Sequence, residues 1–223
     1  MKFRCSRIYE LMTKPREKSK ELSDTAKGLI IDTYLQNTYG YKEDVMTDAM
    51  YKGIFLENEA IGLVTKVLGG FRIKNDQRFE NDFVIGTPDV VYKDYVEDIK
   101  VSENIRTFVN AEISKMYEWQ LQTYMWLTGK TKARLIYCLL PDPQEITLNK
   151  KERFFYKLNC DAESIDYKLC SKQIDLNQET IKNIPIEKRV KVFEIDFDPS
   201  KIEDLKVAVE NATTYYNSLK DII

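Results

Sequence analysis

The chain has 223 residues, with 34 Lys and Arg against 36 Asp and Glu, and it contains no histidine. The missing histidine excludes Ser-His-Asp and Cys-His nucleophiles and every zinc site that depends on histidine. Any acid–base or metal chemistry must therefore use carboxylates, lysines, tyrosines or thiols. The length suits one domain with room for an inserted subdomain, and an apolar content of 43% is ample for a packed core.

Charge and hydropathy indicate a soluble, cytoplasmic protein. The formal charge of −2 argues against a generally basic nucleic-acid surface, although it leaves room for a local groove. The longest apolar runs, such as Ala133–Leu140, fall short of the ~20 residues that span a bilayer, and no signal-peptide stretch follows Met1. The cysteines are far apart, so we expect free thiols in a reducing compartment. They are Cys5, Cys138, Cys160 and Cys170.

The first half of the chain predicts two helices and then a group of strands. Apolar residues at helical spacing predict a helix over Leu22–Tyr39, which Gly40 ends, and a second from about Asp44 to Leu68, which a Gly-Gly pair ends. Short extended segments separated by turn residues follow, and they suggest an antiparallel meander. These segments are Phe71–Ile73, Gln77–Glu80, Phe83–Tyr92 and Tyr95–Val101.

The second half predicts alternating helices and strands. The last helix carries an apolar stripe that we expect to pack against a sheet, with a coiled-coil seam as the alternative. The order of elements implies an α/β or α+β domain whose central mixed β-sheet is flanked by helices. We predict a single domain over residues 1–223 with a helical insertion at about 148–184. The predicted elements are helix Ile113–Leu127, strand Ala133–Leu140, a helical region over Leu148–Thr180, strand Val190–Phe197 and helix Ser200–Asp221.

Two acidic residues and a lysine are predicted to meet on one hairpin. If residues 93–94 form a two-residue turn, Asp89 lies directly opposite Asp98, and both project from the same side of the strand pair. Lys100 shares that face because it follows Asp98 by two residues. A turn of other parity would place Asp89 on the opposite face. Opposed like charges are unfavourable, and a divalent cation held by both carboxylates would compensate them.

Three further features accompany this hairpin. Pro88 cannot donate to a strand ladder, so it marks an edge, a bulge or a bend beside Asp89. Gly53 and Glu57 are four residues apart, as are Gln120 and Tyr124, so each pair is expected on one face of its helix. Each pair alone is explained as well by an ordinary exposed polar side chain. All of them together, in this order, form a much more specific pattern.

The segments GTPD, EDIK and QLQTY resemble the PD-(D/E)XK nuclease superfamily, in which a Pro-Asp hairpin leads to a strand with an acidic-x-Lys motif. The Gln-x-x-x-Tyr helix resembles the branch that includes phage lambda exonuclease, the YqaJ-type nucleases, the RecB nuclease domain and CRISPR-associated RecB-like exonucleases. The segment KGIFLENEA resembles the Gly-x-x-x-Glu helix of the YqaJ and lambda group, with Glu57 where RecB-like enzymes usually have His. The resemblance covers residues 53–124 and implies a restriction-endonuclease-like core.

The resemblance implies a metal site. Glu57, Asp89 and Asp98 would coordinate Mg²⁺, or Mn²⁺ as a substitute, together with the backbone carbonyl of Ile99. Asp98 stands where many relatives have Glu, and its shorter side chain shifts the metal by about one methylene group. RecB-like relatives often carry cysteines for an iron–sulfur cluster, three of them close together. The cysteines of this chain are too widely separated, so no cluster is expected.

The resemblance also implies an activity and partners. Lys100 would position or polarise the attacking water, while Gln120 and Tyr124 would orient that lysine or contact the nucleic-acid backbone. The implied function is a metal-dependent DNA exonuclease acting in viral or bacterial DNA recombination or processing. DNA, a single-strand annealing or recombination protein and further copies of the chain are the implied partners. Two alternatives stay open: a catalytically silent nuclease-fold module that binds DNA or assembles, and a helical interaction protein that uses the terminal stripe.

DNA contact would require local positive charge. Three basic groups are candidates, and the third lies beside aromatic residues 154–156, which an amphipathic helix would explain equally well. The groups are Arg72, Lys74 and Arg78; Lys130, Lys132 and Arg134; and Lys150, Lys151 and Arg153. The N-terminal cluster Lys14–Lys20 is expected to be a solvated face.

Overall fold

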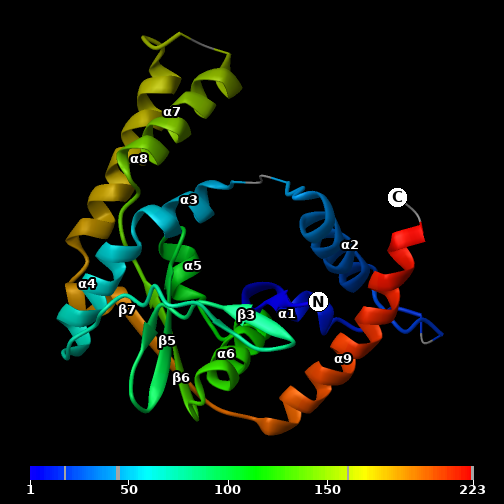
Figure 1. Ribbon diagram of the computed structural model, residues 1–223. Helices are drawn as coiled ribbons and strands as arrows, with labels where there is room; N and C mark the ends of the chain where they lie inside the picture. Colours follow the sequence, from blue (N-terminus) through cyan, green and yellow to red (C-terminus); the bar gives the residue numbers. More distant parts are fainter. Residues whose placement is uncertain (18, 44–45, 160, 222–223) are drawn as a thin grey trace.

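The computed structural model describes residues 1–17, 19–43, 46–159 and 161–221. A four-stranded sheet with the order β4-β5-β6-β7 lies at its centre (Figure 1). Strands β5 and β6 are parallel and the two outer pairs are antiparallel, which confirms the predicted mixed sheet flanked by helices. The strands are β4 (Val90–Val91), β5 (Tyr95–Val101), β6 (Lys132–Cys138) and β7 (Val190–Asp196).

A second, three-stranded sheet stands beside the first. Its order is β1-β3-β2, with β1 (Phe3–Arg4) parallel to β3 (Val84–Gly86) and β2 (Phe79–Glu80) antiparallel to it. The predicted single meander is therefore wrong: residues 71–78 form no strand, and the predicted strand over 83–92 is divided between the two sheets. The division falls at Pro88, which has no N–H to continue the ladder.

Helices cover both faces of the central sheet. Helix α4 (Glu57–Leu68) packs on the face that contains Ile99 and Ile136. Helix α6 (Lys115–Thr128) packs on the opposite face, against Val96 and Leu135. The buried residues of β5 and β6 thus alternate between two cores, as expected for strands covered on both sides.

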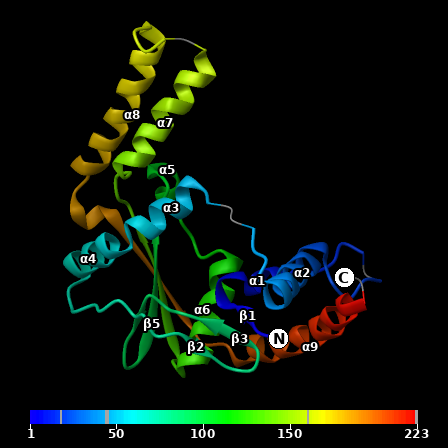
Figure 2. The same ribbon diagram turned by 45° about the horizontal axis from the view of Figure 1, so that its top comes forward.

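Helices α1 (Ile8–Leu11), α2 (Asp24–Tyr39) and α9 (Pro199–Ser218) form a further layer outside α6. Figure 2 shows α2 and α9 side by side. The buried stripe of α9, which includes Leu205 and Val209, packs mainly on helices α1, α2 and α6. The predicted packing of this stripe against a sheet is therefore wrong, because α6 already covers that face.

The predicted helix over residues 44–68 is two helices. Its predicted start at Asp44 lies outside the described residues, and α3 (Asp48–Phe55) begins after the N-cap Thr47. The backbone leaves helical geometry at Leu56, with φ −97° and ψ 9°, before α4 begins. The break separates two packing tasks: Lys52 of α3 enters a buried ion pair with Asp142, whereas α4 lies along the sheet.

Two antiparallel helices, α7 (Gln144–Leu158) and α8 (Ile165–Asn183), connect β6 to β7 and project from the body (Figures 1 and 2). They confirm the helical region predicted over Leu148–Thr180. Asp142, just before α7, accepts from Gln178 of α8 and pairs with Lys150 of α7 at 2.6 Å. Short α5 (Ile105–Val109) follows β5, and 3₁₀ turns lie at 5–7, 186–189 and 219–221.

Among the described residues, every helix is too short or too polar to span a bilayer. Cys5, Cys138 and Cys170 are free thiols, as predicted. The prediction for Cys160 lies outside the described residues.

Candidate active site

The hairpin between β4 and β5 has the predicted register. Val90 pairs with Glu97 and Val91 with Val96, while the Tyr92 amide donates to the Tyr95 carbonyl at 2.9 Å. The connection is therefore the expected two-residue turn at 93–94. Continuing this register places Asp89 opposite Asp98.

The backbone at Asp89 departs from a regular ladder. The amide of Ile99, which would otherwise bond to the Pro88 carbonyl, donates to Asp89 Oδ2 at 2.6 Å. Asn75 supports the bend from the other side: its Nδ2 donates to the Pro88 carbonyl at 2.9 Å and its amide donates to the Asp89 carbonyl at 2.8 Å. Sequence reasoning missed Asn75, since no local pattern links it to a residue fourteen positions away.

Asp98 and Lys100 form an ion pair on the face toward α6. The Lys100 Nζ lies 2.8 Å from Asp98 Oδ2, and the Asp98 side chain is almost fully buried. The same ammonium lies over the ring of Tyr117, 5.4 Å from its centroid. Burial opposes the charge of Lys100, but Asp98 and Asp89 together raise its pKa well above the usual value. Lys100 is therefore a cation at neutral pH.

Asp89 is held in an unfavourable environment for a carboxylate. Burial is the main cause and the charge of Asp98 the second, and together they raise the pKa of Asp89 to about 7. Lys100 offsets only part of this effect. The two aspartates thus lie near one lysine, and their mutual repulsion is the one that the hairpin pattern predicted.

Helix α6 contributes Gln120 and Tyr124 from one face, as their spacing predicted. Gln120 Nε2 lies 3.3 Å from Asp98 Oδ1 and 2.9 Å from the Tyr124 hydroxyl, and it donates to both. Gln120 therefore contacts the acidic residue, and the structure gives no contact between it and Lys100. Ser114 caps α6 by accepting from the Tyr117 amide, and Gly129 ends the helix in the left-handed conformation.

Gly86, the last residue of β3, allows this strand to approach α6 closely. A Cβ at this position would lie 2.6 Å from Tyr124 Cε1 and 2.7 Å from Cys5 Sγ. Burial raises the pKa of the Cys5 thiol to about 12, so Cys5 acts here as a small apolar side chain. The glycine before Pro88 and Asp89 thus has a packing reason that the sequence alone did not reveal.

Glu57 lies at the first position of α4, at the edge of the pocket. Its Oε2 is 2.8 Å from Lys74 Nζ, and both side chains are about one-third exposed. The charge of Glu57 contributes to the raised pKa of Asp89, which shows that the two carboxylates are near one another. Gly53 lies in α3, so the expectation that it shares one helix with Glu57 is wrong, because the helix breaks at Leu56.

The donor set fits a hard divalent cation. Carboxylate oxygens from Asp89 and Asp98 converge, and buried Asp98 Oδ2 accepts no hydrogen bond despite its ion pair with Lys100. Oxygen ligands of this kind suit Mg²⁺ or Mn²⁺. Across the described ranges, no three acidic or cysteine side chains lie close enough together to hold a metal ion. The two aspartates therefore form the assembled part of the predicted site, and Glu57 is paired with Lys74 instead.

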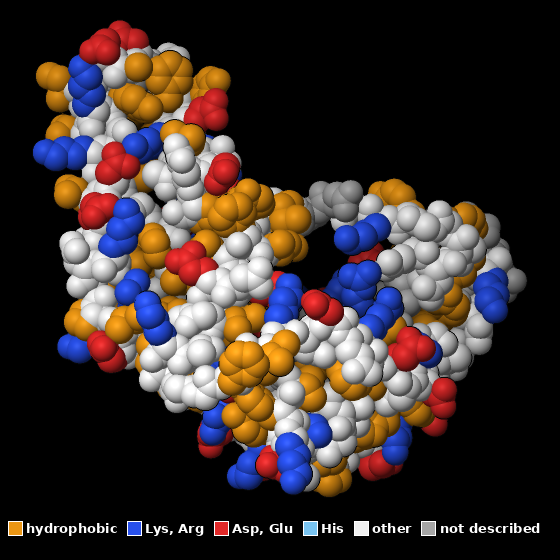
Figure 3. All heavy atoms as spheres, turned by 60° about the vertical axis from the view of Figure 1, so that its left-hand side comes forward, with side chains coloured by type: hydrophobic (Ala, Val, Ile, Leu, Met, Phe, Trp, Pro, Cys, Tyr) orange, Lys and Arg blue, Asp and Glu red, His pale blue; other side chains and the backbone are white. Residues whose placement is uncertain are grey.

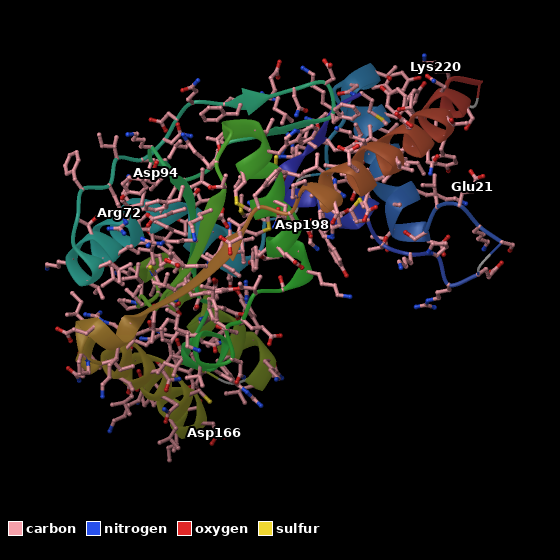
Figure 4. All side chains as sticks on the ribbon, turned by 90° about the horizontal axis from the view of Figure 1, so that it is seen from below. Glu21, Arg72, Asp94, Asp166, Asp198 and Lys220 are labelled. Carbon is pink, nitrogen blue, oxygen red and sulfur yellow. The ribbon has the colours of Figure 1, made fainter. Side chains whose placement is uncertain are left out.

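Most of the basic residues predicted to contact DNA are occupied by acidic partners. Arg72 forms a buried bidentate pair with Glu97, and Figure 4 shows it on the segment that leads from α4 toward the hairpin carrying Asp94. Ion pairs also hold Lys74, Lys132, Arg134, Lys150, Lys151 and Arg153. Lys130 donates to the Lys93 carbonyl. Of the nine candidates, Lys130 and Arg78 are the two without an ion pair among the described residues.

A cationic hollow of about 810 Å³ lies next to this pocket. Figure 3 shows Lys and Arg side chains gathered where the surface is hollowed. Two of its lining residues, Ser6 and Ile85, are the chain neighbours of the Cys5 and Gly86 that abut Tyr124. Its basic lining residues are Lys2, Arg4, Arg7, Lys42 and Arg78. Apart from Arg78, no sequence pattern predicted this group, because it joins the N-terminus, α2 and the second sheet.

Comparisons with known proteins agree with this architecture. No protein-family model matches the chain, and no curated protein matches it. A solved phage-related exonuclease from Haemophilus somnus 129PT is 26% identical, with a TM-score of 0.79 over 99% of this chain and 96% of that one. The alkaline exonuclease LHK-Exo from Laribacter hongkongensis is 15% identical, with a TM-score of 0.66 over 97% and 88%. A complex of LHK-Exo with dAMP gives a TM-score of 0.65.

The central sheet, the hairpin carrying Asp89 and Asp98, and the likeness to a phage-related exonuclease over nearly the whole chain lead to one classification. The chain has the fold of the exonucleases of the YqaJ and lambda type, and its motifs resemble those of the PD-(D/E)XK nucleases.

Proposed function

We propose that the chain is a divalent-metal-dependent DNA exonuclease that hydrolyses phosphodiester bonds. The observation that carries the proposal is the neighbouring pair of carboxylates, buried Asp98 and half-buried Asp89, beside the protonated Lys100. An arrangement that gathers negative charge in a dry pocket is costly unless a cation binds there. The likeness to exonucleases supports the same reaction class.

Asp89 and Asp98 would hold Mg²⁺ or Mn²⁺ with the carbonyl of Ile99, and Glu57 would complete the site. A bound divalent cation supplies charge neutralisation at the scissile phosphate and makes an attacking water more acidic. Lys100 is a cation, so its role is to donate hydrogen bonds to the water or to a phosphate oxygen.

Gln120 and Tyr124 complete the pocket from α6. Gln120 fixes one oxygen of Asp98 and leaves the other free of hydrogen bonds, so the carboxylate is oriented before any cation arrives. Tyr124 anchors the Gln120 amide, and burial with the charge of Asp98 raises the Tyr124 pKa. The Tyr124 hydroxyl is therefore a neutral hydrogen-bonding group, suited to positioning and not to proton abstraction.

The substrate strand is proposed to run through the cationic hollow. Arg4 and Arg78 line it, and within the described part of the chain neither forms an ion pair. Free guanidinium groups suit phosphate contacts. LHK-Exo binds dAMP in its solved complex, which supports a nucleotide ligand for this fold. We further propose one nuclease domain with α7 and α8 as an insertion, working in the cytoplasm in viral or bacterial DNA recombination, with a single-strand annealing protein and other copies as partners.

The decisive experiment is a cleavage assay with the purified protein. Linear duplex, single-stranded and covalently closed circular DNA are each incubated with Mg²⁺, Mn²⁺ or EDTA. We expect metal-dependent release of nucleotides from linear DNA and none from closed circles. Asp89→Asn and Lys100→Ala should each lower the rate by about 10²–10³-fold, because each removes a charge aimed at the reacting phosphate. Asp94→Asn, at the exposed hairpin turn, is the matched control.

Absence of cleavage in every combination would leave the silent nuclease-fold module as the function. Cutting of closed circles would replace exonuclease with endonuclease. If Asp89→Asn kept full activity, Asp89 would not belong to the active site, even if the wild type were an exonuclease.

A further inference from the structure

Lys74 is held in a fixed place at the edge of the acidic pocket. Its neighbour Arg72 is anchored to buried Glu97 and to the Gly69 carbonyl. On its other side, Asn75 bonds to the backbone of the Pro88–Asp89 bend. The segment is thus fixed both before and after Lys74, and its ammonium lies 2.8 Å from Glu57 Oε2.

The two lysines of the pocket have different partners and different exposure. Lys100 pairs with the almost fully buried Asp98, whereas the Lys74–Glu57 pair is about one-third exposed on both sides. Ion pairs that are open to solvent contribute little net stability and separate readily. The Lys74 pair is therefore the one that an incoming cation can displace.

We propose that Lys74 is an internal counterion that occupies Glu57 until a divalent metal displaces it, and that the released ammonium then contacts the phosphate backbone of the substrate strand. A divalent cation on Glu57 would repel an ammonium 2.8 Å away from the same oxygen. The hydrogen bond to Glu57 is the main cause that raises the pKa of Lys74, and the charge of Asp89 adds a smaller contribution. Once displaced, it would remain at the mouth of the pocket because its backbone is anchored.

This inference rests on the proposed function, because it takes Glu57 as a metal ligand. It explains why the described residues contain no assembled group of three metal ligands: Glu57 is held by an internal cation. Lys74 is thus a positioning residue that sets metal affinity and afterwards contributes to substrate binding.

The first test is Mn²⁺ binding without nucleic acid, followed by the electron paramagnetic resonance signal of free Mn²⁺. Lys74→Ala should bind Mn²⁺ about two- to five-fold more tightly than wild type, since the competing exposed ion pair is gone. Lys74→Arg should bind as wild type does, because it keeps the counterion. Lys66→Ala, which removes an exposed lysine from the same helix as Glu57, is the control and should change nothing. Unchanged or weaker Mn²⁺ binding by Lys74→Ala overturns the proposal.

The second test is binding of a fluorescent phosphorothioate oligodeoxynucleotide in the presence of Mn²⁺. Lys74→Ala should bind more weakly, and the slope of log affinity against log salt should decrease by about one, because one phosphate contact is lost. In Lys74→Ala the affinity for metal therefore rises and the affinity for DNA falls. Loss of a lysine with a merely structural role would weaken both. An unchanged DNA affinity and salt slope refute the phosphate contact.

The two levels of proposal fail differently. If the wild type binds no Mn²⁺ and cleaves no DNA, the proposed function is wrong. If the wild type binds Mn²⁺ and cleaves DNA but Lys74→Ala and Lys66→Ala behave alike, the role of Lys74 is wrong and the nuclease stands.

Discussion

Two regions of the molecule bury aspartates beside lysines, and they do so with opposite results. At the base of the α7–α8 hairpin, Asp142 lies between Lys52 and Lys150, at 2.9 and 2.6 Å. Burial alone would raise its pKa, but the two lysines hold it below the usual value. In the candidate active site, Asp89 shares a pocket with a second carboxylate, and its pKa is raised to about 7.

The difference lies in charge balance and in hydrogen bonding. Both oxygens of Asp142 have cationic partners, and Gln178 adds a further hydrogen bond, so the network joins the hairpin to the body without unsatisfied carboxylate atoms. The active-site pair has an excess of negative charge and a carboxylate oxygen, Asp98 Oδ2, without a hydrogen bond. The first arrangement is suited to stability and the second to binding a cation. The same residue type thus serves architecture or ligation according to its neighbours.

The largest loss of stability is expected when the buried Asp142 network of the first region is disrupted. Asp142→Asn leaves Lys52 buried without a counter-charge and should lower the free energy of unfolding by about 3 kcal/mol. Urea unfolding measures this change. Asp175→Asn, which removes the exposed partner of Lys151, is the matched control and should cost well under 1 kcal/mol. Equal losses in the two variants would show that burial of the network does not matter.

A smaller loss is expected at the contact between β3 and α6. Gly86→Ala places a methyl group against Tyr124 and Cys5 and should destabilise the fold by about 1–3 kcal/mol through overpacking. Because Tyr124 anchors Gln120, cleavage should decrease as well. Gly62→Ala provides the control, since nothing lies within 4 Å of its Cβ position inside α4. That change should be neutral or slightly stabilising. A stable, fully active Gly86→Ala would contradict the close approach.

Asp89→Asn should raise the stability of the metal-free protein at high pH, whereas Asp142→Asn should lower it. Its pKa of about 7 lies above the ordinary value of 3.8, so the folded state retains the proton more strongly than the unfolded chain. Stability is therefore withdrawn as pH rises from about 4 to about 7. Metal-free Asp89→Asn should be more stable than wild type at pH 8 by about 1–2 kcal/mol, with no gain at pH 4.

Thermal unfolding in EDTA at pH 4, 6 and 8 measures the difference between wild type and Asp89→Asn. Mn²⁺ should restore the stability of the wild type at pH 8 and leave the variant unchanged. If the difference in stability between wild type and Asp89→Asn did not change with pH, charge repulsion at Asp89 would not be the cause.

The smallest loss of stability is expected at the exposed ion pair between the α7–α8 hairpin and the body. Arg153 pairs with Asp48 of α3 at 2.7 Å, but the Arg153 side chain is mostly exposed. Arg153→Ala should lower stability by about 0.2–1 kcal/mol in urea unfolding. A loss as large as that of Asp142→Asn would mean that the hairpin is anchored at its surface and not through the buried network.

The sequence allowed prediction of features that depend on short, regular spacing. The two-residue turn determines which side chains share a face, so the opposition of Asp89 and Asp98 followed from counting. The shared face of Gln120 and Tyr124 followed from helical periodicity in the same way. The terminating glycines of α2 and α6 were also readable, because Gly40 and Gly129 both adopt the left-handed conformation.

Features that depend on distant contacts were not predictable from one sequence. Strand β1 pairs with β3 across some eighty residues, so the second sheet has no local signal. The break at Leu56 separates α4 from a helix whose Lys52 is buried against Asp142, ninety positions away. Lys74 pairs with Glu57 through a loop that has no regular structure, so no sequence pattern predicts the pair. For this reason the sequence predicted that Lys74 is available to contact DNA. Partner choice among charges is set by tertiary packing.

The packing of α9 on α2 has a consequence for how the protein is made. The wall of the cationic hollow comes largely from residues 1–46, yet α2 is buried against Leu205, Val209 and Ala212 near the end of the chain. The hairpin carboxylates and the α6 residues beside them, from Asp89 to Tyr124, belong to the middle of the chain. During synthesis the acidic pocket can therefore form before the surface proposed to receive the nucleic acid, which requires the last helix to leave the ribosome. The acidic pocket and the proposed nucleic-acid surface would thus form at different times during translation.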